Sequence, residues 1–271
     1  MLRSLWVAKT GMDAQQANLD SISNNLANVS TTAYKRVRPI FEDLLYQNIR
    51  APGMNEDSAS YVPAGLQAGN GARIAATQRI NSAGSLVQSQ NPLDMAINGN
   101  GFFAVSTPTG VAYTRAGNFM RNDKGQIVTA SGNVLLGQSS ISSGNANAAG
   151  IVIPSKATTV AIGTDGTVSY NLADSTAPTQ ADQIAMINFV NPTGLASAGG
   201  GLYYETMSSG EAQIGVAGKE GFGSITQYYT EQSNVNVAEE LVSLIAAQRA
   251  YEITAKSVSA SDQILQKLGQ L

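Results

Sequence analysis

Residues 236–269 read NVAEELVSLIAAQRAYEITAKSVSASDQILQKLG, a segment with the periodicity of a long helix. Apolar residues recur in it every three or four positions, which places them on one face of a helix. They are Leu241, Leu244, Tyr251, Ala255, Val258, Leu265 and Leu268, with Gln248 and Asp262 as polar interruptions. Asn236 can cap the helix, Glu239 completes a capping box three residues later, and Gly269 can end it. We therefore predict a helix of about 32 residues, roughly 48 Å long.

The amino end repeats this pattern. Its apolar positions are Leu5, Ala8, Met12, Leu19, Ile22, Leu26 and Val29, with Gln15 in the one polar slot. They predict a helix from about Ser4 to Asn28, roughly 37 Å long. Gly11 lies inside it and costs about 1 kcal/mol relative to Ala. One apolar face on each helix is typical of two helices that pair like a coiled coil and then pack on something else. The alternative is an ordinary helical pair on a globular core.

The middle of the chain has the pattern of a β-rich unit, in which short apolar or alternating runs are separated by turn residues. The predicted strands are Phe102–Val105, Val111–Thr114, Phe119–Arg121, Ile127–Thr129, Val134–Leu136, Val160–Ile162, Val168–Tyr170 and Ile184–Val190. The stretch Gly137–Gly150 is rich in Ser, Asn, Ala and Gly and predicts an exposed loop. Residues 46–73 have no helical periodicity and predict an extended connector.

Together these patterns predict an α+β fold with a mainly antiparallel β middle domain. We expect a terminal helical core from residues 1–34 and 228–271, an extended connector from residues 35–76, and a β-rich outer domain from residues 77–227.

Composition excludes several classes of function. Hydrophobic residues make up 43% of the chain and charged residues 13%, about half the usual share, with a net charge of −3. The densest basic run is Lys35, Arg36 and Arg38, too short for a nucleic-acid interface. No stretch is long and apolar enough for a membrane span, and the amino end lacks the apolar core of a signal peptide. The chain has no Cys and no His, which removes disulfides, thiolate nucleophiles, Cys/His zinc sites and imidazole bases.

The remaining candidate motifs have ordinary structural explanations. Residues 98–101 (NGNG) and 199–201 (GGG) lack the strand–loop–helix context of a nucleotide site, so we interpret them as turns. The carboxylates Asp94, Asp123, Asp165 and Asp182 form no calcium-ligand pattern. Glu239 and Glu240 lie in the first turn of a helix, where the helix dipole favours negative charge. We therefore predict no catalytic, metal or cofactor site, and no enzymatic activity.

Several segments resemble the axial proteins of the bacterial flagellum, a family of rod, hook and hook-associated proteins. The amino-terminal segment SNNLANVSTTAYKR (residues 23–36) is similar to the family's first signature. The segments SNVNVAEELV (233–242) and QRAYE (248–252) are similar to its second. Similar central segments are DMAINGNGFF (94–103), YTRAGNF (113–119) and NPTGL (191–195). Ala33 departs from the family pattern, which usually has Gly there, and residues 228–231 are a loose version of the usual approach to the second helix.

Within this family, FEDLLYQ (residues 41–47) and the Pro/Gly-rich connector most resemble distal-rod members. The resemblance implies a structural subunit that polymerises into a helical tube and transmits torque from motor to hook. It implies export by the flagellar type III apparatus without a cleaved signal, into the periplasm-spanning rod of the basal body. The implied partners are the chain itself, proximal rod subunits, the hook protein and the surrounding ring bushing. Alternatives are another axial subunit, proximal rod or hook, or more distantly a secreted β-rich carbohydrate-binding or hydrolytic protein.

We expect subunit packing to involve the helix faces and their amide-rich flanks. The predicted packing residues are Leu5, Met12, Leu19, Ile22, Asn25, Leu26, Asn28, Val29, Leu241, Leu244, Gln248, Arg249, Tyr251, Val258, Leu265 and Leu268.

Overall fold

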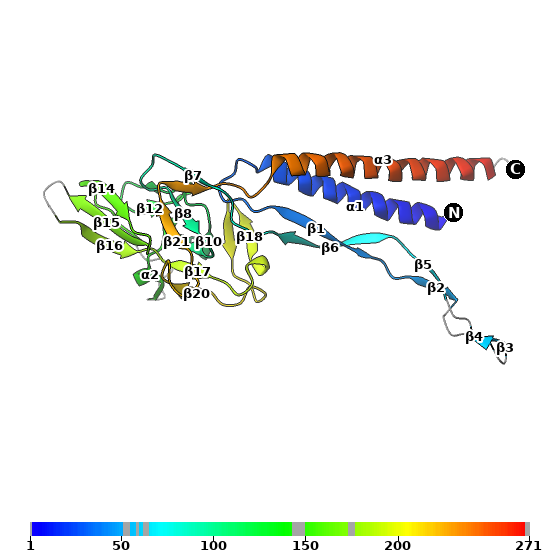
Figure 1. Ribbon diagram of the computed structural model, residues 1–271, viewed down its shortest axis with the longest axis horizontal. Helices are drawn as coiled ribbons and strands as arrows, with labels where there is room; N and C mark the ends of the chain where they lie inside the picture. The colour runs from blue at the N-terminus through cyan, green and yellow to red at the C-terminus, as the bar shows by residue number, and fades with distance from the viewer. Residues whose placement is uncertain are drawn as a thin grey trace. The chain divides into compact units, whose positions relative to one another are not determined.

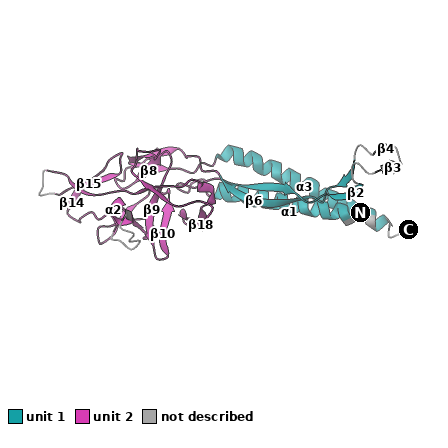
Figure 2. Cartoon of the chain, turned by 90° about the horizontal axis from the view of Figure 1, so that it is seen from below, with its two compact units in different colours: residues 1–27, 37–79, 236–271 teal, residues 28–36, 80–235 magenta. Residues whose placement is uncertain are grey.

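The computed structural model describes residues 2–50, 55–57, 60–61, 65–142, 150–172 and 177–268. The chain divides into two compact units, coloured in Figure 2. Unit 1 contains residues 1–27, 37–79 and 236–271, and unit 2 contains residues 28–36 and 80–235. Residues 28–34 and 228–235, which the predicted division groups with the terminal helices, therefore fall in unit 2.

The two long helices belong to unit 1. Helix α1 spans Leu2–Ala27 and α3 spans Val237–Leu268, close to the bounds that the apolar periodicity predicts. Asn236 caps α3, because its Oδ1 accepts a hydrogen bond from the Ala238 amide at 3.1 Å. Gly269, the predicted end of this helix, lies outside the described residues. The helices run antiparallel and contact each other, so both chain ends lie at the same end of the pair (Figure 1).

Unit 1 also contains a long hairpin within the predicted connector. Strand β1 (Val37–Asp43) pairs antiparallel with β6 (Ala72–Arg79), and both contact α1. Further along the hairpin β2 (Gln47–Arg50) pairs with β5 (Leu66–Ala68), and β3 (Asn55–Asp57) pairs with β4 (Ser60–Tyr61). The segment is extended, as the missing helical periodicity indicates, and it pairs with itself.

Unit 2 consists mainly of antiparallel strands, and each predicted strand position carries one. Its largest sheet runs in the order β11-β12-β13-β9-β10-β19-β18, with β17 pairing both β9 and β20. The bounds in this sheet are β9 Phe102–Thr107, β10 Gly110–Thr114, β11 Met120–Arg121, β12 Ile127–Val128, β13 Val134–Leu135, β17 Met186–Asn188, β18 Ala196–Gly199, β19 Leu202–Tyr204 and β20 Gln213–Gly215. A short 3-10 helix covers Pro192–Gly194.

Smaller pairings complete unit 2. Strands β14 (Ala157–Ile162), β15 (Thr167–Leu172) and β16 (Thr179–Gln183) form a three-stranded sheet. Strand β7 (Leu86–Gln88) pairs with β22 (Tyr229–Glu231), and β8 (Met95–Asn98) pairs with β21 (Ser224–Gln227). In the predicted exposed loop, Gln138–Ser142 form the short helix α2, and residues 143–149 lie outside the described part of the chain.

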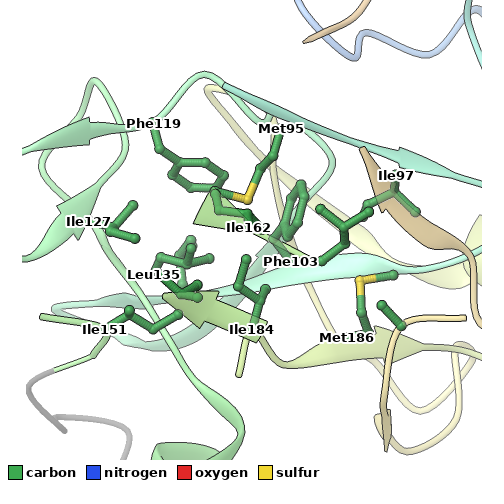
Figure 3. Close-up of a cluster of buried hydrophobic side chains, with 14 of the residues drawn as sticks. Met95, Ile97, Phe103, Phe119, Ile127, Leu135, Ile151, Ile162, Ile184 and Met186 are labelled. Atoms are coloured by element: carbon green, nitrogen blue, oxygen red, sulfur yellow. The ribbon is translucent and has the colours of Figure 1, made fainter. Parts of the chain in front are cut away.

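The core of unit 2 follows from the alternation of side chains along β9. Phe103 and Val105 belong to one buried cluster, whereas Phe102 and Ala104 belong to another. In the first cluster, drawn in Figure 3, the rings of Phe103 and Phe119 meet edge to face with centroids 5.4 Å apart. Because both faces of β9 are buried, its first four residues, 102–105, are all apolar, and the strand lies at the centre of the unit.

Candidate functional site: the segments next to the terminal helices

Asn25 joins the elements of unit 1. It is buried near the end of α1, and its side chain pairs with the backbone of Val37 at the start of β1. The Val37 amide donates to Asn25 Oδ1 at 3.0 Å, and Asn25 Nδ2 donates to the Val37 carbonyl at 2.8 Å. Asn25 Nδ2 also donates to Glu240 Oε2 of α3 at 3.4 Å. One neutral side chain thus holds two helices and a strand together.

The buried residues of α1 and α3 are mostly small or polar. Ala14, Ile22 and Asn25 are buried on α1, and Glu240 and Ala247 are buried on α3. A Cβ added to Gly11 would lie 3.7 Å from Thr254 Cγ2, an ordinary contact distance. The helices therefore approach closely, and the larger apolar residues of α3 have little room between them.

The predicted packing residues fall into three groups. Ile22 and Asn25 are buried; Leu5, Met12, Leu19, Leu26, Asn28, Val29, Leu244 and Val258 are partly buried. Leu241, Gln248, Arg249 and Tyr251 are exposed. The side chains of Leu265 and Leu268 lie outside the described residues.

Helix α3 carries exposed apolar side chains on the side away from its buried residues. Val242, Ile253 and Ile264 are 69%, 67% and 52% exposed, and each lies eleven residues from the next. Eleven residues are close to three helical turns, so the three side chains share one face. Ile245, three residues after Val242, extends this face. We call these four residues the α3 apolar stripe.

In unit 2, the segment after α1 is fastened to the segment before α3. Ala33 has a left-handed backbone with φ of 56°, and its amide donates to the Glu231 carbonyl at 2.8 Å. Asn234 Oδ1 accepts from the Arg36 amide at 2.7 Å, and Asn234 Nδ2 donates to the Ile80 carbonyl at 2.8 Å. The turn at Ala33 needs a conformation that glycine adopts more readily, which explains why the resemblance expects Gly there.

A buried ionic cluster lies beside this junction and consists of Lys35, Arg115 and Glu231. Glu231 Oε1 accepts from Lys35 Nζ at 2.5 Å and from the Gly84 amide at 2.9 Å. Its other oxygen, Oε2, accepts from Arg115 Nε at 2.9 Å. All three side chains are almost completely buried. We call these three residues the Glu231 cluster.

The remaining donors of the two cations bond to backbone carbonyls. Lys35 Nζ donates to the Ser82 carbonyl at 2.8 Å. The terminal nitrogens of Arg115 donate to the carbonyls of Ile97, Gly99 and Gly101, at distances between 3.0 and 3.3 Å. Gly99 and Gly101 have φ of 115° and 137°. The NGNG segment is therefore a turn that aims carbonyl groups at Arg115.

Two cations share one carboxylate in the Glu231 cluster, and the pKa values reflect this. Burial lowers the pKa of Lys35, and the charge of Arg115 adds to that effect against the attraction of Glu231. Burial by itself raises the pKa of Glu231, but Arg115 and Lys35 outweigh it and hold that pKa below its usual value. The carboxylate of Glu231 is thus charged at neutral pH.

No member of the Glu231 cluster is among the predicted packing residues. Each of the three lies inside a segment that was noted for its family resemblance. Lys35 lies in residues 23–36, Arg115 in residues 113–119 and Glu231 in residues 228–231. The available signal was the presence of charged residues in motifs of a chain that has few charges.

The described residues give no support for other kinds of site. Within them, no group of three or more acidic residues could hold a metal ion. None of the helices in the described part of the chain has the length and apolar character to cross a membrane. Asp94 accepts hydrogen bonds from Ser89 and Asn91, and Asp165 accepts from Thr167, so both stabilise local turns.

Comparison with known proteins identifies the family. The model described as flagella basal body rod protein matches residues 5–35, the flagellar hook protein FlgE/F/G D1 domain matches residues 96–170, and the flagellar basal body rod FlgEFG protein C-terminal matches residues 226–271.

Similar proteins cover the whole chain. The flagellar basal-body rod protein FlgG of Buchnera aphidicola subsp. Acyrthosiphon pisum is 48% identical over 100% of both chains. The FlgG protein of Caulobacter vibrioides is 42% identical over 100% of this chain and 99% of its own length, and that of Bacillus subtilis is 37% identical with the same coverage. The chain therefore belongs to the flagellar basal-body rod protein family, whose members are structural proteins and not enzymes.

Proposed function

We propose that this chain is the distal-rod subunit of the bacterial flagellum and that it polymerises into a helical tube which transmits torque from motor to hook. The observation that carries the proposal is the full-length similarity to FlgG proteins together with an α3 apolar stripe that unit 1 leaves exposed. A surface that binds a different surface of an identical copy, without closing a ring, generates a filament.

The terminal helices form the core of this polymer in our proposal, paired in the manner of a coiled coil. Unit 1 has a receiving surface as well as the stripe. An apolar groove of about 760 Å³ is lined mainly by small residues of α1 and α3, among them Ala8, Gly11, Thr254 and Ser257. Large side chains on one copy and a groove of small side chains on the next are complementary in shape. The sixteen predicted packing residues are proposed to line these helix contacts.

The proposal extends to location and neighbours. The subunit is placed in the rod of the basal body, after export by the flagellar type III apparatus without a cleaved signal. Its partners are further copies of itself, the proximal rod subunits, the hook protein and the ring bushing around the rod. The low charge of the chain favours such neighbours, because burying few charges limits the desolvation cost of each contact.

Substitution of Ile253 by Asp tests the proposal. The side chain is exposed in the single chain, so the variant should fold and keep the circular dichroism spectrum of the wild type. Burying Ile contributes about 2 kcal/mol, and a buried unpaired carboxylate costs more than that, so each added subunit meets the penalty.

The readout is motility and electron microscopy of basal bodies in a strain that lacks the protein. We expect Ile253→Asp to give no completed rods. The matched control is Met207→Asp, the same kind of change at an exposed apolar residue of unit 2. A strain that carries this control variant should swim. Normal rods with Ile253→Asp would refute the assignment of α3 to the polymer core.

A further inference from the structure

The Glu231 cluster is held together by its carboxylate. Both oxygens of Glu231 are used, one by Lys35 and the Gly84 amide, the other by Arg115. Among the described residues, Lys35 and Arg115 form no ion pair with any other carboxylate. Removal of Glu231 alone therefore leaves two buried cations close together, with only neutral carbonyl groups as acceptors.

The three charges come from distant parts of the chain. Glu231 follows Lys35 by 196 residues and Arg115 by 116 residues. The three also fall in the three separately matched regions, residues 5–35, 96–170 and 226–271. Most of unit 2, including β8 and the turn after it, which supply the carbonyl partners of Arg115, precedes the residue that supplies the negative charge of the cluster.

The segment with Glu231 makes further contacts that depend on its arrival. Strand β22 pairs with β7, and the Glu231 carbonyl accepts from Ala33. Asn234 bonds the backbone at Arg36 and Ile80. All of these bring residues 28–36 and 80–88 into unit 2 at the same place as the ionic cluster.

We propose that Glu231 acts as a folding lock: unit 2 does not close around Lys35 and Arg115 until the segment 228–235 has been added. Before that point two buried cations without a counter-charge oppose closure, and the amino-terminal segment 28–36 lacks its hydrogen bonds to Glu231 and Asn234. Closure is therefore coupled to the presence of the last part of the chain. Such coupling keeps an incomplete chain open, and it is a property of the isolated chain that does not depend on rod assembly.

Hydrogen exchange of the full-length monomer tests the proposal. The first variant is Glu231→Gln, which keeps the shape of the side chain and removes the charge. We expect protection of the amides of β8, β9 and β10 to fall together with that of residues 33–36, on the order of a hundredfold. The matched control is Glu42→Gln, which removes the charge from an exposed pair with Arg73 at 3.2 Å, and protection in unit 2 should not change.

A second variant separates the charge effect from general damage. Replacing Lys35 by Met in the Glu231→Gln background removes one of the two unpaired cations. We expect at least about tenfold of the lost protection to return, the opposite of what two independent damaging substitutions produce. If Glu231→Gln does not fold at all, the double variant still tests the proposal, because the proposal requires the double variant to recover folded structure. Loss of protection confined to residues 229–235, or no recovery in the double variant, would overturn the proposal.

Discussion

Substitution of Asn25 by Asp is predicted to destabilise unit 1 strongly, although the two side chains have nearly the same size and shape. The change replaces one NH₂ group by an oxygen. Asn25 Nδ2 donates to the Val37 carbonyl at 2.8 Å and to Glu240 Oε2 at 3.4 Å. In the variant the new oxygen faces two acceptors where a donor stood, and only the bond from the Val37 amide to Oδ1 remains possible.

The magnitude follows from these contacts. A buried carbonyl that loses its donor costs about 1–3 kcal/mol. Two carboxylates about 4 Å apart repel by about 4 kcal/mol at an effective dielectric constant of 20. Protonation of one of them reduces this cost, so we expect a total loss of at least about 3 kcal/mol in the free energy of unfolding. Asn25→Ala has no such repulsion and should lose about 2 kcal/mol.

The assay is urea denaturation of the full-length chain, followed by the circular dichroism signal of the helices. The order of stability should be wild type, then Asn25→Ala, then Asn25→Asp. Asn24→Asp is the matched control, because Asn24 is the exposed neighbour on the same helix, and it should change stability by less than about 0.5 kcal/mol. An Asn25→Asp variant as stable as Asn25→Ala would show that Glu240 does not act on this position, and the reasoning would fail.

Three further outcomes are expected. Leu26→Asp and Leu244→Asp, at partly buried positions of α1 and α3, should each abolish motility in a complementation assay while the near-ultraviolet circular dichroism of unit 2 is kept. The pKa of Glu231 is lower in the folded chain than its ordinary value of 4.5, so its contribution to stability is present above that value and is lost as pH falls through the folded pKa. Acid unfolding of unit 2 can be followed by its tyrosine and phenylalanine signals. In Glu231→Gln the stability of unit 2 should no longer show this dependence on pH. Ala33→Gly should raise the free energy of unfolding by about 0.5–1 kcal/mol, because the backbone there has φ of 56°, and a lower stability in thermal melts would contradict this.

The long helices and most strands could be predicted from the sequence because their signals are local. A 3/4 apolar spacing and the cap at Asn236 define α3 within one stretch of chain. Turn residues such as the Asp165-Gly166 pair mark where β14 ends and β15 begins. Each of these features depends only on neighbours a few residues away.

Features that depend on distant partners could not be predicted in the same way. The pairing of β1 with β6 joins Val37 to Arg79, and no local pattern specifies that register. The Glu231 cluster joins residues more than a hundred positions apart. The helix faces show a related limit, since apolar spacing does not distinguish a contact within the chain from one with another copy. Leu241 is 42% exposed, whereas the small Ala247 is 4% exposed and faces α1.

The asparagines of the two signature segments have a physical role that a low-charge chain requires. Asn25 in unit 1 and Asn234 in unit 2 each offer a donor and an acceptor on one short side chain, and each bonds backbone groups where the chain leaves a helix or enters one. A peptide-like amide can satisfy a backbone N–H and a C=O at once without adding charge, which neither Asp nor Lys can do. In unit 2 the Glu231 cluster adds a buried ionic contact, in which a single carboxylate joins segments from three parts of the chain. Neutral bridges and a buried ionic contact thus fasten the segment that follows α1 and the segment that precedes α3.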